Sequence, residues 1–247
     1  MANPSDIKKI VKNGYAQIAK ASNQCGCGSC CGSNITVQKQ SGELGYSQEE
    51  MSSVPDGANL GLGCGNPTAI ASLQQGEVVL DLGSGTGFDV FLAAKKVGKM
   101  GRAIGVDMTD EMLTKANENA KRGGYTNVEF KKGDIEDLPV DDNSVNVVIS
   151  NCAINLAPDK AKVFKEIYRV LKSGGRLMVS DVVLVKPLPD DLKNNKDMLV
   201  GCVSGAILKA DYLSLLKQTG FTNIKIHQET PAFLPEYGLS ITYSATK

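Results

Sequence analysis

The fold is decided by the stretch Val78-Val79-Leu80-Asp81-Leu82-Gly83-Ser84-Gly85-Thr86-Gly87. An apolar, β-branched run ends in an acid and is followed by glycines at alternate positions. The segment 88–97, which comes directly after, is amphipathic. This order predicts a buried strand, a tight turn and a helix. Glycines let the backbone approach a ligand closely, and the first turn of the helix offers unpaired N–H groups to an anionic group.

The spacing of the glycines narrows the class of ligand. Dinucleotide-binding turns favour G-x-G-x-x-G, whereas here the third glycine arrives one residue earlier. The G-x-G-x-G turn preceded by Asp81 resembles the first motif of Rossmann-like methyltransferases that bind S-adenosylmethionine (SAM). This resemblance implies SAM as the cofactor. An acid at the end of the second predicted strand, such as Asp107, would also suit NAD. We disfavour NAD because the third glycine comes one residue early and because of the residues that follow the fourth strand.

Strand and helix patterns alternate along the chain from residue 76. We expect strands at 78–82, 102–107, 128–132, 145–150, 176–183, 223–228 and 239–246. We expect helices at 5–20, 47–53, 67–73, 88–97, 110–121, 159–171, 190–203 and 210–219, with glycines 174 and 175 ending the helix at 159–171. Such alternation is typical of a parallel sheet covered on both faces.

We therefore predict an α/β fold, a Rossmann-like class I SAM-dependent methyltransferase whose mostly parallel seven-stranded sheet carries helices on both faces. Residues 1–75 are expected to form a helical, cysteine-rich extension. Residues 76–186 form the SAM-binding core, and residues 187–247 complete the sheet and include a small insert that carries Cys202. The cysteine-rich run 25–31, diluted by Gly and Ser, is expected to be a loop.

The composition excludes several functions. The chain has 247 residues and a formal net charge of zero, which gives no reason to expect nucleic acid or an anionic membrane as a partner. The chain has no apolar run long enough to span a bilayer and its first residues have no apolar leader pattern, so we expect neither a membrane span nor a secretory signal. The expected compartment is the cytoplasm, where thiols stay reduced. We expect a monomer, because no apolar stripe is left over.

The predicted cofactor site lies at the carboxyl ends of the strands, where doubly wound sheets bind ligands. Asp107 is placed to accept both ribose hydroxyls, and Asp134 to accept from the adenine amino group. Met108 and Ile135 would flank the adenine ring. The methionine end would lie against the glycine turn and the end of the fourth strand. The complete predicted set is Asp81, Gly83, Ser84, Gly85, Gly87, Asp107, Met108, Asp134, Ile135 and Asn151.

The seven cysteines indicate thiol chemistry. Burial as small hydrophobic residues explains one or two of them, but not the cluster at 25–31. Cys152 directly follows the fourth strand, where it can be a nucleophile, a ligand for a soft element or a bystander in a turn. A soft acceptor with a lone pair needs no general base, and His227 is the only histidine in the chain.

Several segments together resemble the arsenite methyltransferase family. They are 60–67 around Cys64, 81–89, Asn151-Cys152-Ala153-Ile154-Asn155-Leu156 with the four residues after it, and Gly201-Cys202-Val203-Ser204-Gly205-Ala206, preceded by the pair Cys30-Cys31. The resemblance runs from about residue 10 to residue 245. It implies that As(III) arrives as a conjugate of a small thiol and is bound by Cys64, Cys152 and Cys202. It also implies that the arsenic lone pair attacks the methyl group of SAM.

The same resemblance implies a redox cycle. Cys30 or Cys31 would form a disulfide with Cys64 when the methylated arsenic is reduced, and thioredoxin or glutathione would reset it. Cys25 and Cys27 fall outside the resemblance; they can relay metalloid, act as substitute redox partners or help to bind zinc through four thiolates. Two other functions stay open: a SAM-dependent methyltransferase for a small organic or other thiophilic acceptor, and a protein that sequesters or senses metalloid without catalysis.

Overall fold

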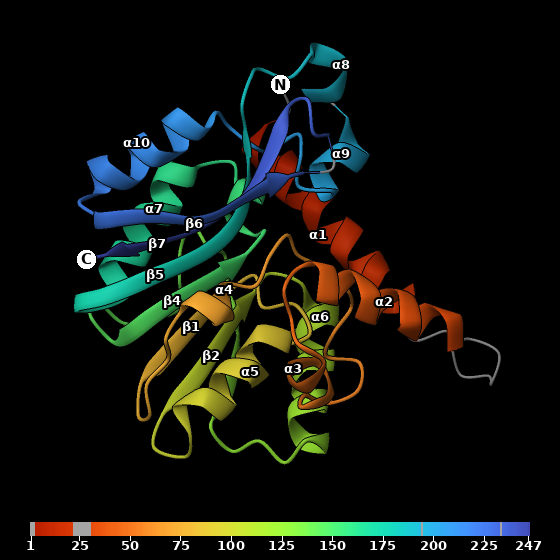
Figure 1. Cartoon of the computed structure of the whole chain (residues 1–247), viewed down its shortest axis with the longest axis vertical. Helices are drawn as coiled ribbons and strands as arrows, with labels where there is room; N and C mark the ends of the chain where they lie inside the picture. The colour runs from red at the N-terminus through yellow and green to blue at the C-terminus, as the bar shows by residue number, and fades with distance from the viewer. Residues whose placement is uncertain (1–2, 22–30, 194, 233) are drawn as a thin grey trace.

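The computed structural model of the chain describes residues 3–21, 31–193, 195–232 and 234–247. Its centre is a seven-stranded sheet in the order β3-β2-β1-β4-β5-β7-β6 (Figure 1). The strands are β1 (Val78–Leu82), β2 (Arg102–Asp107), β3 (Val128–Lys132), β4 (Val145–Asn151), β5 (Leu171–Leu184), β6 (Thr222–Pro231) and β7 (Gly238–Thr246). Strands β1 to β5 pair in parallel, and β7 runs antiparallel to both of its neighbours. This is the predicted mostly parallel sheet of a class I methyltransferase.

Helices cover both faces of the sheet. The longer ones are α1 (Pro4–Ala21), α2 (Cys31–Glu43), α5 (Phe88–Val97), α6 (Asp110–Arg122), α7 (Lys160–Val170) and α10 (Lys209–Thr219). The shorter ones are α3 (Gln48–Ser52), α4 (Pro67–Ile70), η1 (Ile154–Leu156), α8 (Asp190–Lys193) and α9 (Lys196–Val200). Helix α3 begins at a capping box between Ser47 and Glu50, which satisfies two backbone N–H groups at its start.

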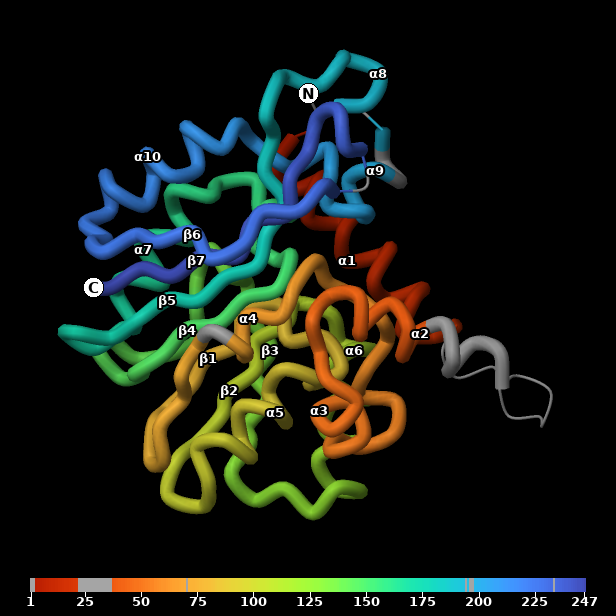
Figure 2. Tube along the Cα trace, in the orientation of Figure 1, coloured from red at the N-terminus to blue at the C-terminus, as the bar shows by residue number. Residues whose placement is uncertain are grey.

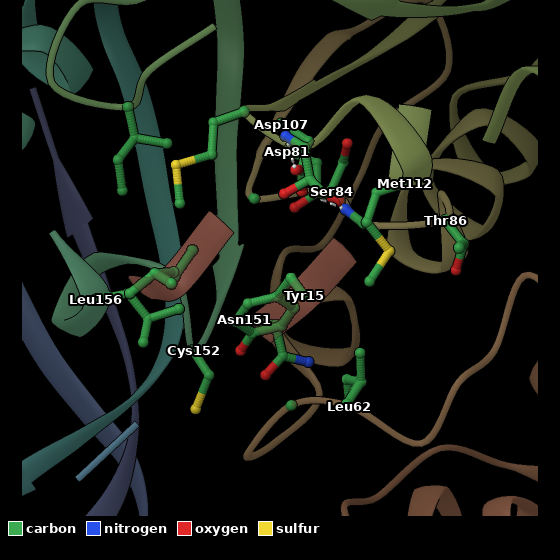
Figure 3. Close-up of a pocket in the computed structure, with 18 of the residues that line it drawn as sticks. Tyr15, Leu62, Asp81, Ser84, Thr86, Asp107, Met112, Asn151, Cys152 and Leu156 are labelled. Atoms are coloured by element: carbon green, nitrogen blue, oxygen red, sulfur yellow. Dashed lines mark hydrogen bonds between the residues drawn. The ribbon is translucent and has the colours of Figure 1, made fainter. Parts of the chain in front are cut away.

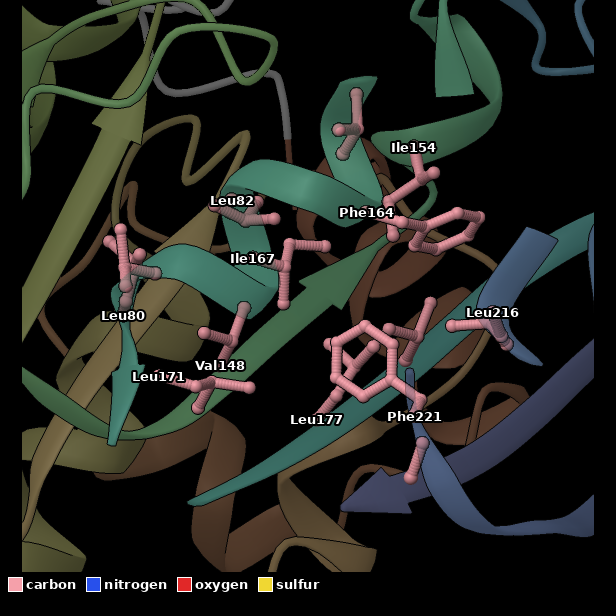
Figure 4. Close-up of a cluster of buried hydrophobic side chains, with 14 of the residues drawn as sticks. Leu80, Leu82, Val148, Ile154, Phe164, Ile167, Leu171, Leu177, Leu216 and Phe221 are labelled. Carbon is pink, nitrogen blue, oxygen red and sulfur yellow. The ribbon is translucent and has the colours of Figure 1, made fainter. Parts of the chain in front are cut away.

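Successive residues of the central strands face opposite sides of the sheet, as the period of two requires. Leu80, Leu82 and Val148 belong to the larger core, which α7 and α10 complete (Figure 4). Val79, Val147 and Ile149 point to the other face and pack against α5. Burial on both faces explains why these strands read as continuous apolar runs.

The N-terminal helix lies against α6 and α9, outside the layers of the core (Figures 1 and 2). It therefore joins the middle of the chain to the insert that precedes Cys202. In the part of the chain that the structure describes, no helix is both long and apolar enough to cross a membrane.

Three expectations about local structure were wrong. Residues 25–30 of the predicted loop 25–31 lie outside the described residues, but its last residue, Cys31, begins α2, where no helix was predicted. The insert forms the two short helices α8 and α9, and Cys202 follows them instead of lying on a helix. The glycines at 174 and 175 do not end α7. The helix ends at Val170 because Leu171 is extended and pairs with Val145. Residues 172–175 then form an irregular stretch before the next pairing, that of Val147 with Arg176.

Candidate active site

A pocket opens at the carboxyl ends of β1, β2 and β4, between the sheet and α1 (Figure 3). Nine of the ten predicted cofactor residues line it: Asp81, Gly83, Ser84, Gly85, Asp107, Met108, Asp134, Ile135 and Asn151. Gly87 does not line the pocket; it begins α5 and lies against the rings of Phe91 and Phe130. The strand ends meet at one edge because the strands are parallel.

The glycine turn is shaped by its contacts with two strand ends. Gly83 has φ +68°, and a Cβ at this position would lie 2.6 Å from the Cβ of Ala153, so only glycine fits. The N–H of Gly83 donates to the carbonyl of Val106 (2.8 Å), and the N–H of Gly85 donates to Asp107 Oδ2 (2.9 Å). The turn that follows β1 is thus tied to the end of β2.

Acidic side chains concentrate negative charge in the pocket. Asp81 is only 4% exposed, and burial together with the charges of Asp89 and Asp107 raises its pKa well above the ordinary value. Burial also raises the pKa of Asp89 to about 6 and raises the pKa of Asp107. Among the described residues no hydrogen bond reaches the Asp81 carboxylate. A cationic ligand is therefore favoured here.

SAM fits these groups. Its sulfonium and ammonium charges suit the acids, and its ribose hydroxyls suit Asp107, whose Oδ1 and Oδ2 accept one backbone N–H each and keep further lone pairs. The buried Ser84 hydroxyl lines the pocket and has no hydrogen-bond partner among the described residues, so it can bond to a ligand.

The predicted adenine end of the pocket contains an ion pair that sequence reasoning missed. Lys8 Nζ lies 2.5 Å from Asp134 Oδ2 and 2.6 Å from Glu136 Oε2. Asp134 Oδ1 accepts the N–H of Glu136 (2.9 Å). Asp134, which was predicted to accept from the adenine amino group, therefore also links α1 to the end of β3.

Helix α1 supplies part of the pocket wall through Lys8, Val11 and Tyr15. The spacing i, i+3, i+7 places these three side chains on one helix face. The pattern that could have indicated this wall is weak, because this helix face mixes a cation, an aliphatic residue and a phenol. Leu62, 42% exposed, and Met112 also line the pocket and were not predicted.

The structure brings together cysteines from three distant parts of the chain. Cys64, Cys152 and Cys202 pack in one apolar cluster with Val182, Leu184 and Ala206. Cys64 and Cys152 form a disulfide, with their Cα atoms 5.9 Å apart. Cys202 Sγ lies 3.4 Å from the carbonyl oxygen of Cys152. Cys152 also lines the cofactor pocket, so the cluster adjoins it (Figure 3).

Two of these cysteines have an unusual backbone. Cys152 has φ +57° and Cys202 has φ +65°, in the left-handed region that non-glycine residues rarely adopt. The N–H of Cys152 donates to the carbonyl of Ser180 (2.8 Å), and Asn155 Nδ2 donates to the carbonyl of Cys202 (2.6 Å). Strained residues held by such contacts are typical of functional sites.

Cys202 is the one free thiol that the structure describes. Burial, and next the negative charge of Asp181, raises the pKa of Cys202 to about 12. The Tyr15 hydroxyl, 3.9 Å from Cys202 Sγ, and the Asn155 amide oppose this rise. Asp181 accepts from Tyr212 Oη (2.9 Å), and burial raises its own pKa to about 7.

Four cysteines lie in the N-terminal segment before Cys64. Cys25, Cys27 and Cys30 fall outside the described residues, and Cys31 is placed only as the first residue of α2. The expected disulfide between Cys64 and Cys30 or Cys31 is therefore untested; in this structure Cys64 is bonded to Cys152. With that bond formed, the described residues contain no group of three or more His, Cys, Asp or Glu side chains arranged to hold a metal ion.

The sheet order and the acidic pocket behind a G-x-G-x-G turn define a SAM-dependent methyltransferase, and a family model described as a methyltransferase domain matches residues 73–220. The chain is 47% identical to an arsenite methyltransferase of Halobacterium salinarum, over 99% of this chain and 68% of that relative. It is 36% identical to one of Aquipseudomonas alcaligenes, over 95% of this chain and 67% of the relative. The chain belongs to the arsenite methyltransferase family.

A solved structure agrees with this family. The crystal structure of an arsenic(III) S-adenosylmethionine methyltransferase from Chlamydomonas reinhardtii superposes with a TM-score of 0.69 at 34% identity. The match covers 84% of this chain and 73% of the algal one. This share is larger than residues 73–220, which the family model matches. The structural similarity therefore extends beyond that domain on at least one side.

Proposed function

We propose that this chain transfers a methyl group from SAM to As(III) bound by the thiolates of Cys64, Cys152 and Cys202. The observation that carries the proposal is the cluster of these three cysteines beside the acidic pocket, with Cys152 bordering both. Sulfur ligands select soft elements. A cluster of sulfurs against a cofactor pocket therefore favours a thiophilic acceptor over an organic amine or hydroxyl.

When bound, SAM supplies an electrophilic methyl carbon on a sulfonium. The side chains of this chain then act by position. Asp81 and Asp107 hold the cationic cofactor, and the cysteines hold arsenic so that its lone pair faces the methyl group. Arsenic needs no proton removed before it attacks, so the residues near Cys152 have only to orient the acceptor and exclude water. The apolar neighbours Leu156 and Val182 suit the second task.

Binding requires the reduced state. Two thiols are engaged in the Cys64–Cys152 disulfide, and As(III) forms bonds to thiolates. We infer that a thiol reductant such as glutathione or thioredoxin opens this bond and that As(III) then exchanges from a small-thiol conjugate onto the three cysteines. Each exchange releases one small thiol for one arsenic–sulfur bond formed.

The redox cycle follows from electron count. Transfer of a methyl group to the lone pair raises arsenic formally to As(V). Two thiols can return it to As(III) by forming one disulfide, which gives up two electrons. Cys30 or Cys31 remains our proposed partner of Cys64 in this step. The external thiol reductant then reopens the disulfide for the next cycle.

The test combines mass spectrometry with turnover. Reduced chain incubated with As(III) should gain the mass of one arsenic atom less that of the three thiol hydrogens it replaces, and labelled SAM with a thiol should give methylated arsenic. Cys152→Ser and Cys202→Ser should each lose most of both signals. Full turnover of both variants on an organic acceptor would instead support a methyltransferase of the other class. Retained arsenic with no SAM binding by calorimetry would identify a sequestering protein.

A further inference from the structure

The backbone of Cys64 is held on both sides by residues that the proposed mechanism does not use. Its N–H donates to Asn151 Oδ1 (2.9 Å) at the end of β4. Its carbonyl accepts from Ser240 Oγ (2.6 Å) on β7. The two contacts come from positions 87 residues after and 176 residues after the cysteine. No local sequence element accounts for such a pair of contacts.

We propose that Asn151 and Ser240 are positioning residues that hold Cys64 opposite Cys152, so that the two cysteines form a pre-organised dithiol. For the use of this dithiol in arsenic chemistry, the inference rests on the proposed function. The positioning itself concerns only the two sulfurs and the two side chains.

Asn151 is held in place by its own contacts. Its Nδ2 donates to the carbonyl of Gly65 (2.8 Å) and to the hydroxyl of Tyr46 (3.0 Å). The Tyr46 hydroxyl donates to Asp89 Oδ1 (2.8 Å), and both of these side chains are buried. Because both hydrogens of the amide are engaged, the oxygen points at Cys64 in one orientation.

The loop before Cys64 is shaped to this amide. Gly63 has φ +123°, and a Cβ there would lie 2.7 Å from Asn151 Nδ2. Only glycine allows the loop to approach so closely. Asn151 was predicted to bind the methionine end of the cofactor. Its amide also lines the cofactor pocket, so the same side chain touches both the loop and the pocket.

Ser240, on β7, provides the second contact to the Cys64 backbone. It is 7% exposed and pairs with Val182 of β5, which packs in the cysteine cluster. Because it is the third residue of β7 and pairs with β5, Ser240 is held more firmly than a loop residue. Cys64 is thus a loop residue fixed by two strands.

Pre-positioning matters because bond formation between two sulfurs depends on their effective concentration. Two thiols held in place close a disulfide, or bind one As(III) together, without losing the freedom of a mobile loop. Release of one hydrogen bond on Cys64 should therefore disfavour both reactions while leaving the sulfurs chemically unchanged.

The first test uses neither arsenic nor SAM. In a full-length parent chain, every cysteine except Cys64 and Cys152 is replaced by serine. The chain is equilibrated with glutathione and glutathione disulfide. One glutathione disulfide and the two protein thiols give one protein disulfide and two glutathione molecules. Mass spectrometry after acid quench gives the oxidised fraction and hence the equilibrium constant.

We expect Ser240→Ala to lower this equilibrium constant roughly tenfold, and Asn151→Ala by at least as much, because each frees Cys64 on one side. The matched control is Ser244→Ala. Ser244 lies on the same strand, but its hydroxyl bonds to His227 Nε2 (2.8 Å) instead of to Cys64. Thermal unfolding confirms that each variant is folded at the assay temperature.

Equal equilibrium constants for the parent and Ser240→Ala would overturn the proposal. Equal decreases for Ser240→Ala and Ser244→Ala would overturn it as well, because the effect would then be a general loosening of β7. Failure of the proposed function reads out separately. If the chain never methylates arsenite, the proposed function is refuted. If Ser240→Ala and Asn151→Ala still lower the equilibrium constant for the Cys64–Cys152 disulfide and Ser244→Ala does not, the proposed positioning of Cys64 is supported.

Discussion

The Tyr15 hydroxyl lies 3.9 Å from Cys202 Sγ, although 187 positions separate the two residues. Helix α1 therefore reaches from the carboxylates at one end of the cofactor pocket to the cysteine cluster at the other. The N-terminal helix is a wall of both sites, and its side chains offer direct tests of how cofactor and acceptor are held.

Removal of the Tyr15 hydroxyl should slow the reactions of Cys202. Burial raises the pKa of Cys202 to about 12, and donation by Tyr15 favours the reactive thiolate. We expect Tyr15→Phe to slow alkylation of Cys202 by iodoacetamide roughly tenfold at pH 8, as peptide mass spectrometry of the reduced chain can measure. Tyr125→Phe is the control, because the buried Tyr125 hydroxyl has no partner among the described residues. An unchanged rate for Tyr15→Phe would mean that the contact has no role.

Loss of the Lys8 cation should weaken the binding of SAM. Lys8 fastens α1 to Asp134 and Glu136, and α1 lines the pocket. We expect Lys8→Met to raise the dissociation constant of SAM about three- to tenfold by calorimetry. Lys12→Met serves as the control, since Lys12 pairs with the exposed Asp110 and does not line the pocket. The hypothesis fails if Lys8→Met binds SAM as tightly as Lys12→Met does.

Affinity for SAM should rise with pH between about 5 and 7. Burial raises the pKa of Asp89 to about 6 and that of Asp81 well above its ordinary value, so part of the acidic pocket is protonated at pH 5. A cationic ligand favours the ionised acids, so binding releases protons and strengthens as they ionise. Calorimetry in two buffers of different ionisation enthalpy measures the release. Adenosine, which lacks the two positive charges of SAM, should bind with little pH dependence; equal slopes for the two ligands would contradict the interpretation.

Asp181 should make the folded state less stable as the pH rises from about 4 to 7. Burial raises its pKa to about 7, so the folded chain holds a proton that the unfolded chain has already lost. Stability that this proton supplies is present at low pH and is lost as the pH rises through the folded pKa. We expect Asp181→Asn to remove on the order of 3 kcal/mol of this decrease, measured by urea unfolding at pH 4.5 and pH 7.5. Asp211→Asn, at an exposed position of α10, should leave the slope unchanged.

The cofactor pocket was predictable because it follows from local pattern and topology. The order of strand, glycine turn and helix is a short-range signal, and parallel strands bring Asp81, Asp107 and Asp134 to one edge. The role of α1 was not predictable in the same way. The spacing of Lys8, Val11 and Tyr15 indicates a helix face but not what that face covers.

The predictions that depended on a sharp local signal also show where such signals fail. The glycine pair after α7 has the composition of a helix end, yet Leu171 had already paired with Val145. Where the helical periodicity is weak, as in residues 31–43, no helix was predicted, yet these residues form α2. Sheet pairing and packing outweigh local preferences of this size.

By itself, the sequence determined the class of fold and the residue types of the site, because strand and helix periodicity and the spacing of glycines and acids act over short ranges of the chain. Only the tertiary structure decided that Cys64 is bonded to Cys152, and that Asn151 and Ser240 bond to the backbone of Cys64 from two strands. These contacts join residues 87 and 176 positions apart, and such long-range geometry arises only when the sheet assembles.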